Sequence, residues 1–558
     1  MEETIAHADR EAGDPAERQA RVSSGHDNTP EGDEDVNGLG TLVTRAGGRV
    51  PLSDNLRLKM AIFDSGRVYH VPGVRWTPDF KAAINTARGK GIHIHEFEEV
   101  DAKTLSNLYR EETEDDIVLP ELQRQQDLAE IIRRAAEAKA SDIHIRILKE
   151  YTEVRIRVFG RLWDMTTRKA EDGMPMIKAA FAVASDTGNS TSDTSFQQGA
   201  LTPRSGLLPR QLDMLRLQYT PESEGRGTLI MRLKYKSNAE DTDIDSLGYN
   251  PVQIGDINVM RKRTNGLYIL AGKVSSGKTT TLQRILNRMI MEKNREISMY
   301  TIEEPVELEL PNATQHPAKK LPDGTDGFLE AMKAALRSDL NVIVVGEIRS
   351  KMLADLAIQA VMTGHALWST IHAGSALGIL DRLSDFGVEP WKLQDPSVVR
   401  GLVYQRLCGV ICPHCRVSFR RAVETGRMEA DLAEHLADIF GKRLDDLYVR
   451  GPGCDKCSHM GLKGRTVVAE TCLTDPRLLE LFSEGRRMEM RKYWSTGIEE
   501  QGMGGLPVLH HALTKVGAGL CDIFEVEEEV DLVSSYDRDF SHLKSRIRDD
   551  IRRLEARS

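Results

Sequence analysis

Apolar and polar residues follow two different spacings along the chain, and each spacing predicts one kind of element. From about residue 251 to residue 405, short apolar runs alternate with longer stretches in which apolar residues recur every three or four positions. The runs are typical of strands buried on both faces, and the stretches are typical of helices that cover them. We therefore expect an α/β domain built on a parallel sheet. The expected strands cover residues 267–271, 297–301, 342–345 and 366–370, and the expected helices include 279–291 and 327–336.

The chain before this domain is expected to form two smaller α/β regions. Residues 41–115 alternate short apolar stretches with turn residues, and residues 120–240 begin with a helical pattern followed by alternating strand-like segments. A polar segment, 241–250, predicts a linker, and residues 471–558 are expected to be helical. Within 120–240 we expect a helix over 122–139, strands at 142–146, 153–158 and 229–233, and a loop over 185–205.

Length and charge narrow the class of protein. A chain of 558 residues is too long for one ordinary hydrophobic core, so about three or four domains are expected. Residues 1–40 hold eleven acidic and three basic residues, which predicts a disordered acidic tail. The remainder is nearly neutral, so net charge gives no argument for nucleic-acid binding. We find neither the pattern of a secretion signal nor an apolar run near the ~18 residues of a spanning helix, and we expect a cytoplasmic protein.

A glycine-rich segment directly after the strand expected at 267–271 matches the pattern G-x-x-x-x-G-K-[ST]. Such a loop, between a buried strand and a helix, surrounds phosphates with backbone N–H groups. Lys278 would reach the β- and γ-phosphate oxygens of ATP, and the Thr279 hydroxyl would bind Mg²⁺. The expected nucleotide-binding residues are Gly272, Lys273, Val274, Ser275, Ser276, Gly277, Lys278, Thr279 and Thr280.

Acidic and histidine residues follow the other expected strands. Ligands of α/β proteins bind at the carboxyl ends of parallel strands, so Glu347 would face the nucleotide and activate a water molecule. Glu303 and Glu304 would position a metal ion or water, and a solvated acidic turn is the alternative. His365 and His372 bracket an expected strand, where they would sense the γ-phosphate, although single histidines are usually structural.

Two C-x-x-C pairs, Cys412 with Cys415 and Cys454 with Cys457, stand out among the seven cysteines. Seven are too few for a disulfide framework in so long a chain. Four thiolates in two knuckles predict a closed tetrahedral Zn²⁺ site. A redox dithiol is the alternative, but it would need only one pair. We therefore expect residues 406–470 to form a zinc-binding insertion.

The order of these motifs, a phosphate loop, T-I-E-E-P-V-E, G-E-I-R and T-G-H with S-T-I-H, resembles the hexameric ATPases of type II secretion and type IV pilus assembly. Upstream, A-S-D-I-H-I from Ala140 and R-I-R-V-F-G-R-L from Arg155 are similar to the opening of that family's N-terminal α/β domain. The resemblance covers about residues 120–530. It implies a RecA-like nucleotide domain over 251–405.

The resemblance also implies residues and partners that no local pattern shows. Arg216 and Arg232 fall where the family's N-terminal domain supplies arginines that reach the nucleotide, commonly across a domain or subunit boundary. Ordinary strand-surface arginines are the alternative. The family further implies a homo-hexamer that is recruited to the inner membrane through a membrane platform and cytoplasmic adaptor proteins, with no direct nucleic-acid contact.

The sequence departs from the family at several positions. Lys273 and Ser275 stand where the family usually has Pro and Gly, Glu304 replaces an Asp, and Ser350 follows G-E-I-R where Asp is common. The segment before Arg216 matches the family's hairpin poorly. These features are closer to plasmid-type thin-pilus or conjugation-associated members than to housekeeping secretion motors.

The sequence as a whole indicates a P-loop ATPase that uses ATP, Mg²⁺ and structural Zn²⁺ and powers type IV pilus assembly or type II-like protein secretion. The alternatives are a nucleic-acid translocase or conjugative DNA-transfer ATPase, a pilus retraction motor and a nucleotide-gated scaffold. DNA-stimulated hydrolysis would identify the first of these. Glu347 argues against the scaffold, because a water-activating carboxylate serves hydrolysis rather than binding.

Overall fold

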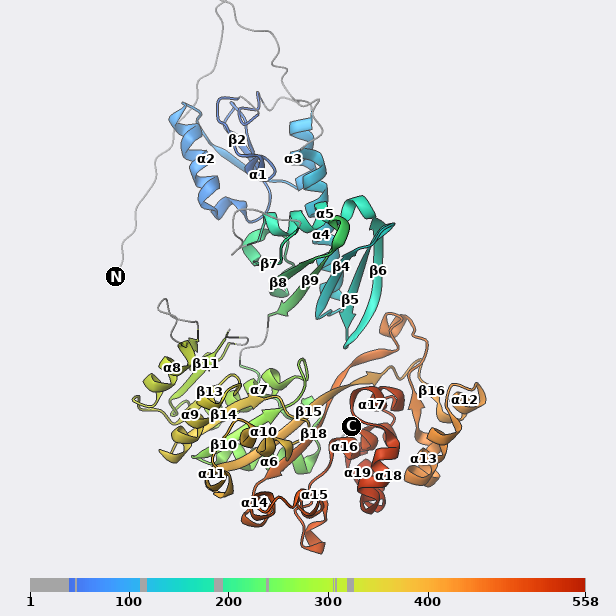
Figure 1. Ribbon diagram of the computed structural model, residues 1–558. Helices are drawn as coiled ribbons and strands as arrows, with labels where there is room; N and C mark the ends of the chain where they lie inside the picture. Colours follow the sequence, from blue (N-terminus) through green and yellow to red (C-terminus); the bar gives the residue numbers. More distant parts are fainter. Residues whose placement is uncertain are drawn as a thin grey trace, which may run out of the picture. The chain divides into compact units, whose positions relative to one another are not determined.

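The computed structural model shows an α/β protein with antiparallel and mixed sheets (Figure 1). The chain divides into two compact units, one built mainly from residues up to Arg133 and the other mainly from residues after it. The expected acidic tail lies almost wholly outside the described residues, as does the first part of the loop expected at 185–205. The described residues are 40–45, 48–110, 118–184, 194–236, 240–304, 306, 309–318 and 326–556.

The first unit contains a three-stranded sheet, β1 (Met60–Ile62), β2 (Arg67–His70) and β3 (Glu96–Glu99). The Thr77 hydroxyl accepts from the Phe80 N–H and so begins α2 (Pro78–Gly89), which packs one face on this sheet. Pro78 suits the first helical position because no N–H is needed there. The other helices of this part of the chain are α1 (Asp54–Arg57), α3 (Ala102–Arg110), α4 (Val118–Glu137) and α5 (Ala170–Ala182).

A six-stranded sheet follows in the order β6-β5-β4-β9-β8-β7. Buried residues alternate along β4, β5 and β9, which is the pattern that predicted them. β6 and β8 were not predicted, and β7 lies in the segment expected to be a loop. β8 pairs antiparallel with β9 and places Arg216 directly opposite Arg232 on one face. The strands are β4 (Asp142–Ile147), β5 (Tyr151–Val158), β6 (Arg161–Lys169), β7 (Gln197–Leu201), β8 (Leu212–Pro221) and β9 (Gly227–Tyr235).

A seven-stranded sheet has the order β12-β11-β13-β14-β10-β15-β18. The four predicted strands are present and parallel to their neighbours. The pairing of β18 with β15 is antiparallel, so the sheet is mixed. That pairing was not predicted because the two strands lie far apart in the sequence. The strands are β10 (Gly266–Ala271), β11 (Met299–Glu303), β12 (Thr314–Pro317), β13 (Val342–Val345), β14 (Ala366–Ile371), β15 (Val399–Ile411) and β18 (Leu462–Leu473).

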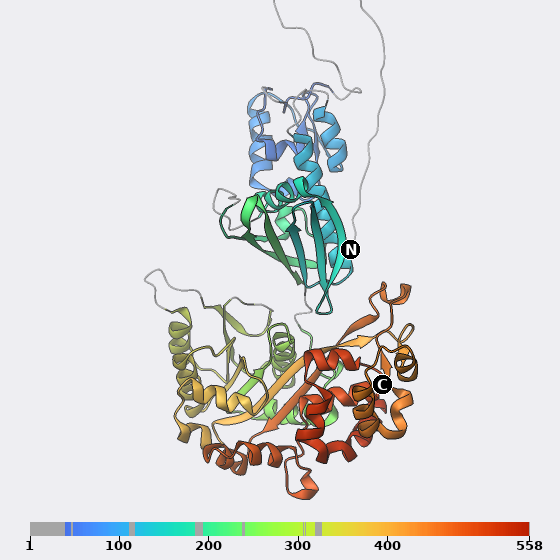
Figure 2. The same cartoon turned by 45° about the vertical axis from the view of Figure 1, so that its right-hand side comes forward.

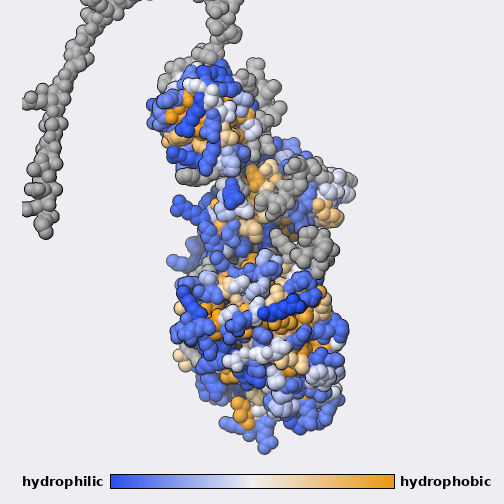
Figure 3. Space-filling view, turned by 90° about the vertical axis from the view of Figure 1, so that its left-hand side faces the viewer, coloured by the Kyte–Doolittle hydropathy of each residue, from blue (hydrophilic) through white to orange (hydrophobic). Residues whose placement is uncertain are grey.

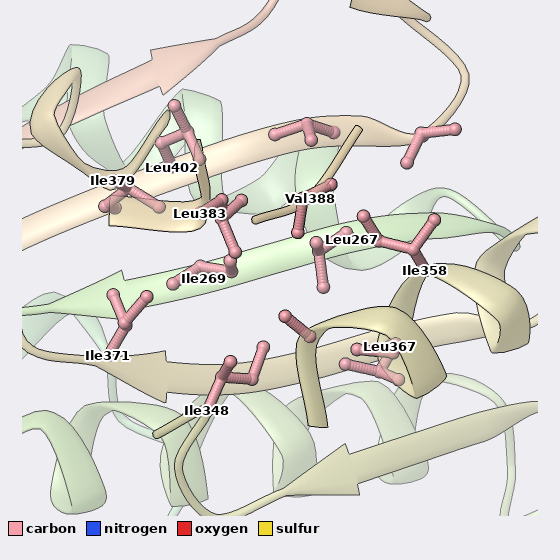
Figure 4. Close-up of a cluster of buried hydrophobic side chains, with 14 of the residues drawn as sticks. Leu267, Ile269, Ile348, Ile358, Leu367, Ile371, Ile379, Leu383, Val388 and Leu402 are labelled. Atoms are coloured by element: carbon pink, nitrogen blue, oxygen red, sulfur yellow. The ribbon is translucent and has the colours of Figure 1, made fainter. Parts of the chain in front are cut away.

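Strand β10 is buried on both faces, which explains its uninterrupted apolar sequence. Leu267, Ile269 and Ala271 face one core (Figure 4), and Tyr268 and Leu270 face a second core on the opposite side of the sheet. The first core includes residues of α8 (Gly327–Ala335), α9 (Lys351–Met362), α10 (Gly378–Asp385) and α11 (Pro390–Gln394), and the second includes α6 (Pro251–Lys262) and α7 (Lys278–Glu292).

Residues 412–461 form an insertion between β15 and β18, which lead from the sheet to it (Figures 1 and 2). It contains β16 (Val417–Ser418), α12 (Phe419–Glu424), α13 (Ala430–Phe440) and β17 (Tyr448–Val449). Phe440 of α13 shares a buried core with Leu513 and Ile551 of the C-terminal helices. Those helices are α14 (Pro476–Ser483), α15 (Arg487–Ser495), α16 (Val508–Gly517), α17 (Ile523–Glu529), α18 (Val533–Phe540) and α19 (Lys544–Glu555).

The face shown in Figure 3 is largely hydrophilic, with hydrophobic residues in small groups. The most exposed large hydrophobic side chains, Phe196, Met488 and Ile498, lie in separate segments, and single exposed residues of this kind are ordinary. Within the described ranges, none of the helices combines the length and the apolar character needed to cross a membrane.

Candidate functional site

The glycine-rich segment forms a turn between β10 and α7. Gly277 has a φ of 83° and Ser275 a φ of 63°, so both lie in the left-handed region. Glycine adopts this conformation readily, whereas Ser275, one of the departures from the family pattern, carries a strain of about 1–2 kcal/mol. The turn brings the N-terminus of α7 to the carboxyl edge of the sheet. N–H groups at such a terminus favour an anion.

A cavity of about 680 Å³ lies over this turn, a volume within the ~300–1,000 Å³ of small-molecule sites. Gly272 is not among its lining residues, and Lys273 lines a neighbouring cavity of about 300 Å³ instead. Most of the residues that the sequence singled out do meet here. Those in the lining are Val274, Ser275, Ser276, Gly277, Lys278, Thr279, Thr280, Glu303, Glu304, Glu347, His372 and Arg232.

Lys278 begins α7 and lies across the turn. Its Nζ donates to the carbonyl oxygens of Gly272, at 2.8 Å, and Lys273, at 3.0 Å. Thr279 follows on the first helical turn and also faces the cavity. An ammonium group beside a helix N-terminus adds its charge to the helix dipole. The combination makes this part of the cavity attractive to a phosphate.

Glu347 and His372 follow the ends of the neighbouring strands β13 and β14, and they are in contact. His372 Nε2 lies 3.1 Å from Glu347 Oε1, and His372 Nδ1 lies 3.2 Å from the Gly272 carbonyl oxygen. A carbonyl oxygen and a carboxylate both accept hydrogen bonds, so the ring satisfies both when it carries two protons. His372 thus joins the turn to the carboxylate that was predicted to activate water.

The two glutamates of the acidic segment have different partners. Glu303 Oε1 accepts from the Thr301 hydroxyl at 2.8 Å and from Gln315 Nε2 at 3.4 Å. Glu304 Oε2 accepts from Arg349 Nη2 at 2.7 Å, which compensates its charge. Arg349 also lines the cavity, and no role was predicted for it from the sequence. The signal for it was present, because it follows Glu347 at the end of the same strand.

Of the two predicted arginines, the structure brings only Arg232 to the cavity. Arg232 Nε donates to Asp142 Oδ1 at 3.0 Å, and the Asp142 side chain is 9% exposed. Arg216 is exposed and is not among the lining residues. Asp142 also lines the cavity. From the sequence, Asp142 was considered only as part of a family motif. Asp142 lies directly opposite Arg232 on the adjacent strand, so the two charges are paired.

His365 stands apart from the cavity. It precedes β14 and His372 follows it, and a strand of six residues separates its two ends by about 20 Å. The Nδ1 atom of His365 lies 3.1 Å from the Ala360 carbonyl oxygen and 3.1 Å from the Thr363 hydroxyl, at the end of α9. The structure therefore does not bring the two histidines together, because they flank opposite ends of β14.

The four cysteines of the two pairs form one cluster in which all four Sγ atoms lie within 4.8 Å of one another. The Sγ–Sγ distances are 3.9 Å for Cys412 and Cys454, 3.9 Å for Cys415 and Cys457, and 3.8 Å for Cys454 and Cys457. Tetrahedral Zn–S bonds of about 2.3 Å would place the sulfurs about 3.8 Å apart. The cluster therefore fits a zinc ion.

The backbone around the cluster supports the same fit. The N–H groups of Cys454 and Gly461 donate to Cys457 Sγ at 3.3 Å and 3.2 Å. Burial raises the pKa of the Cys457 thiol, but these donors and the neighbouring thiols outweigh it and lower the pKa to about 7. Burial and the neighbouring thiols raise the pKa of Cys415 to about 12. Four thiolates would be stable together only beside a cation.

A family model described as Type II/IV secretion system protein matches residues 121–521. The chain is 33% identical over 349 residues to the type II secretion system protein E of Klebsiella pneumoniae, a match covering 62% of this chain and 65% of that protein. It is 31% identical over 384 residues to the type II secretion system ATPase E of Vibrio cholerae, covering 68% and 71%.

A third relative is the type IV pilus assembly ATPase PilB of Thermus thermophilus, 30% identical over 435 residues, with 77% of this chain and 46% of that protein covered. The Klebsiella and Thermus proteins are thus matched over less than two thirds of their own length. The X-ray structure of the Yersinia pseudotuberculosis ATPase DotB aligns with a TM-score of 0.50 at 20% identity, covering 73% of this chain and 94% of that one. That likeness shows a similar fold.

Proposed function

The chain belongs to the type II/IV secretion system protein family, and from that premise we propose that it is an ATPase whose hydrolysis of ATP moves a pilin or an exported protein. One observation carries the proposal: the turn at Gly277, the contact between Glu347 and His372, and Arg232 all line one cavity. Parallel strands on both sides of β10, with the turn at its carboxyl end, support a RecA-like P-loop domain.

The residues around the turn would bind the phosphates. Backbone N–H groups of the turn and of the first turn of α7 would surround them, and Lys278 would reach from the mouth of the turn to the β- and γ-oxygens. The Thr279 hydroxyl would help to hold Mg²⁺, which neutralises charge on those oxygens when bound. Gly272 would support the turn from outside the cavity.

The carboxylates and Arg232 would act on the reaction itself. Glu347 would orient and polarise the attacking water. His372 would hold Glu347 in a fixed position relative to the turn. Loss of the γ-phosphate would then be transmitted to β14. Glu303 and Glu304 would order water near the metal, with Arg349 balancing the charge of Glu304. The guanidinium of Arg232 would offset negative charge that builds on the transferred phosphoryl group.

Assembly and location belong to the same proposal. The chain would work as a homo-hexamer, bound to a membrane platform and cytoplasmic adaptor proteins at the inner membrane. Arg216 is exposed and outside its own chain's cavity, so it would reach a nucleotide only across a subunit boundary. Zn²⁺ would be structural, because four cysteine ligands leave no open coordination position.

Steady-state ATP hydrolysis by the full chain tests the proposal. Lys278→Ala should abolish hydrolysis, because it removes the cation predicted to contact the phosphates. Lys333→Ala is the matched control, since Lys333 lies on α8 and pairs with the exposed Glu330. In cells that depend on this chain, Lys278→Ala should also stop pilus formation or secretion. Hydrolysis by Lys278→Ala at the wild-type rate would contradict the proposal.

A further inference from the structure

One buried glutamine joins the glycine-rich turn to the end of the segment predicted to be a linker. Gln405 lies on β15 and is fully buried. Its Nε2 donates to the Ser276 carbonyl oxygen at 2.7 Å, and its Oε1 accepts from the Tyr249 hydroxyl at 2.5 Å. Ser276 belongs to the turn, and Tyr249 lies two residues before α6. Three segments that are remote in the sequence are therefore connected through one side chain.

The chemistry of the three groups fixes the direction of both hydrogen bonds. A carbonyl oxygen only accepts, so the amide NH₂ group of Gln405 must face Ser276 and its amide oxygen must face Tyr249. Burial raises the pKa of Tyr249 above its ordinary value, so its hydroxyl stays protonated and donates. Loss of either partner would leave a buried polar group unsatisfied, which is costly.

The hydrogen bond to Ser276 also sets the direction of a backbone N–H group. In a trans peptide, the carbonyl of one residue and the N–H of the next point in opposite directions. Gln405 draws the Ser276 carbonyl toward β15, and the Gly277 N–H is thereby directed away from that strand. Gly277 lines the cavity, so this N–H is one of the donors expected to meet a phosphate.

Both ends of the turn are packed against Gln405. A Cβ atom built on Gly272 would lie 2.4 Å from the Gln405 carbonyl oxygen, and one built on Gly277 would lie 3.3 Å from Gln405 Nε2. The first distance leaves no room for a side chain, which accounts for glycine at this position. The turn therefore lies close to the Gln405 backbone at one end and to the Gln405 side-chain amide at the other.

The end of the linker is anchored on each side of Tyr249. Lys515 Nζ donates to the Gly248 carbonyl oxygen at 2.7 Å. Asn250 caps α6, and it forms a reciprocal capping box with Gln253. Tyr249 itself is 4% exposed. The position of the Tyr249 hydroxyl therefore depends on the path of the linker backbone as well as on the Tyr249 side chain.

We propose that Gln405 is a positioning residue for the phosphate-binding turn and that Tyr249 orients it, so that nucleotide affinity depends on how the end of the linker is seated. The proposal rests on the nucleotide-binding function proposed above. It adds a requirement for two residues that do not contact the nucleotide. It also gives the linker a direct route to the turn.

Calorimetric binding of Mg-ADP to the full chain tests the role of Gln405. Gln405→Met keeps the length of the side chain and removes both hydrogen bonds, so the Kd for ADP should rise about tenfold and the KM for ATP should rise more than kcat falls. Thr474→Val is the control, because the Thr474 hydroxyl donates to the Val399 carbonyl at the far end of the same strand. It should lower the thermal midpoint and leave the Kd within twofold of wild type.

Tyr249→Phe tests the role of Tyr249, since it removes a single oxygen atom. The Kd for ADP should rise about threefold, whereas Tyr268→Phe, which removes another buried hydroxyl donating to a backbone carbonyl, should leave it unchanged. The double variant Gln405→Met with Tyr249→Phe should bind no more weakly than Gln405→Met alone, because Tyr249 acts through Gln405. Independent, multiplying effects would overturn that link.

The outcomes separate this inference from the proposed function. A wild-type chain that binds no nucleotide would refute the proposed function. Normal wild-type binding with an unchanged Kd in Gln405→Met would refute the positioning role alone. If Gln405→Met does not fold, Tyr249→Phe tests the proposal instead. An unchanged Kd for ADP in this milder variant would contradict the connection from the linker to the turn.

Discussion

Replacing Cys454 by Ser should release zinc and loosen the two knuckles while the rest of the insertion stays folded. Structural zinc sites contribute about 10–16 kcal/mol, so one of four ligands accounts for about 2.5–4 kcal/mol. Within residues 412–416 and 450–461 the buried hydrophobic side chains are those of Cys412 and Cys457, so little burial remains to hold these segments once the zinc is lost. α13 has separate support, because Leu436 and Phe440 pack into the core of the C-terminal helices.

Two assays test whether the knuckles depend on zinc while α13 does not. Elemental analysis of protein purified without chelators should give one zinc per wild-type chain and much less in Cys454→Ser. Limited proteolysis should cut the variant near residues 412–416 and 450–461 and spare α13. Cys408→Ala is the control, because Cys408 is a buried cysteine outside the cluster. It should retain zinc and the wild-type cleavage pattern.

Two results would contradict a structural role for zinc in the knuckles. Wild-type protein without zinc would remove the structural metal and favour the redox interpretation. A Cys454→Ser variant with full zinc content and unchanged cleavage would show that the knuckles do not depend on the ion. Nucleotide binding should survive the substitution, since the turn at Gly277 belongs to a different core.

Three further predictions concern strain, subunit contacts and pH. Ser275→Gly should raise stability by up to about 1 kcal/mol, because it relieves a left-handed backbone, whereas Ser276→Gly should not; a lower thermal midpoint for Ser275→Gly would contradict this. Lys278→Ala subunits mixed with Arg216→Ala subunits should recover hydrolysis, whereas mixing with Arg232→Ala or Glu347→Gln should not; absence of rescue with Arg216→Ala in confirmed mixed rings would place that arginine outside catalysis. Burial lowers the pKa of Lys515 from 10.5 to about 8, so between pH 8 and 10.5 the unfolded chain binds more protons than the folded chain. The free energy of unfolding should therefore rise with pH in this range, by up to about 3 kcal/mol relative to Lys515→Met. Equal pH slopes of the unfolding free energy for the two proteins would contradict this prediction.

Patterns confined to one segment were sufficient for much of the fold. β13 has the predicted bounds, and α7 extends the predicted helix by one residue at each end. In both elements, the spacing of the apolar residues reflects which side chains of that one element are buried. β18 escaped prediction because its partner β15 lies beyond the insertion. β8 alternates in burial, but Asp213 and Arg216 among its apolar residues obscured the pattern.

The site was predictable where chemistry is local and not where it depends on the sheet. The order of the motifs placed Lys278 and Glu347 in one cavity because parallel strands share a carboxyl edge. The same rule, applied to strand ends rather than strand starts, excludes His365. Gln405 gave no signal, because a single amide within an apolar strand has no local pattern. Its partners are separated from it by more than a hundred residues.

Single-turnover hydrolysis of ATP by Glu347→Gln tests whether this carboxylate activates water, with Glu330→Gln as a control at an exposed glutamate on α8. Glutamine keeps the size of the side chain but removes the carboxylate that polarises water. We expect the variant to bind ATP with nearly wild-type affinity and to hydrolyse it about 10²–10⁴-fold more slowly, while the control is unchanged. Hydrolysis by Glu347→Gln at close to the wild-type rate would contradict this expectation.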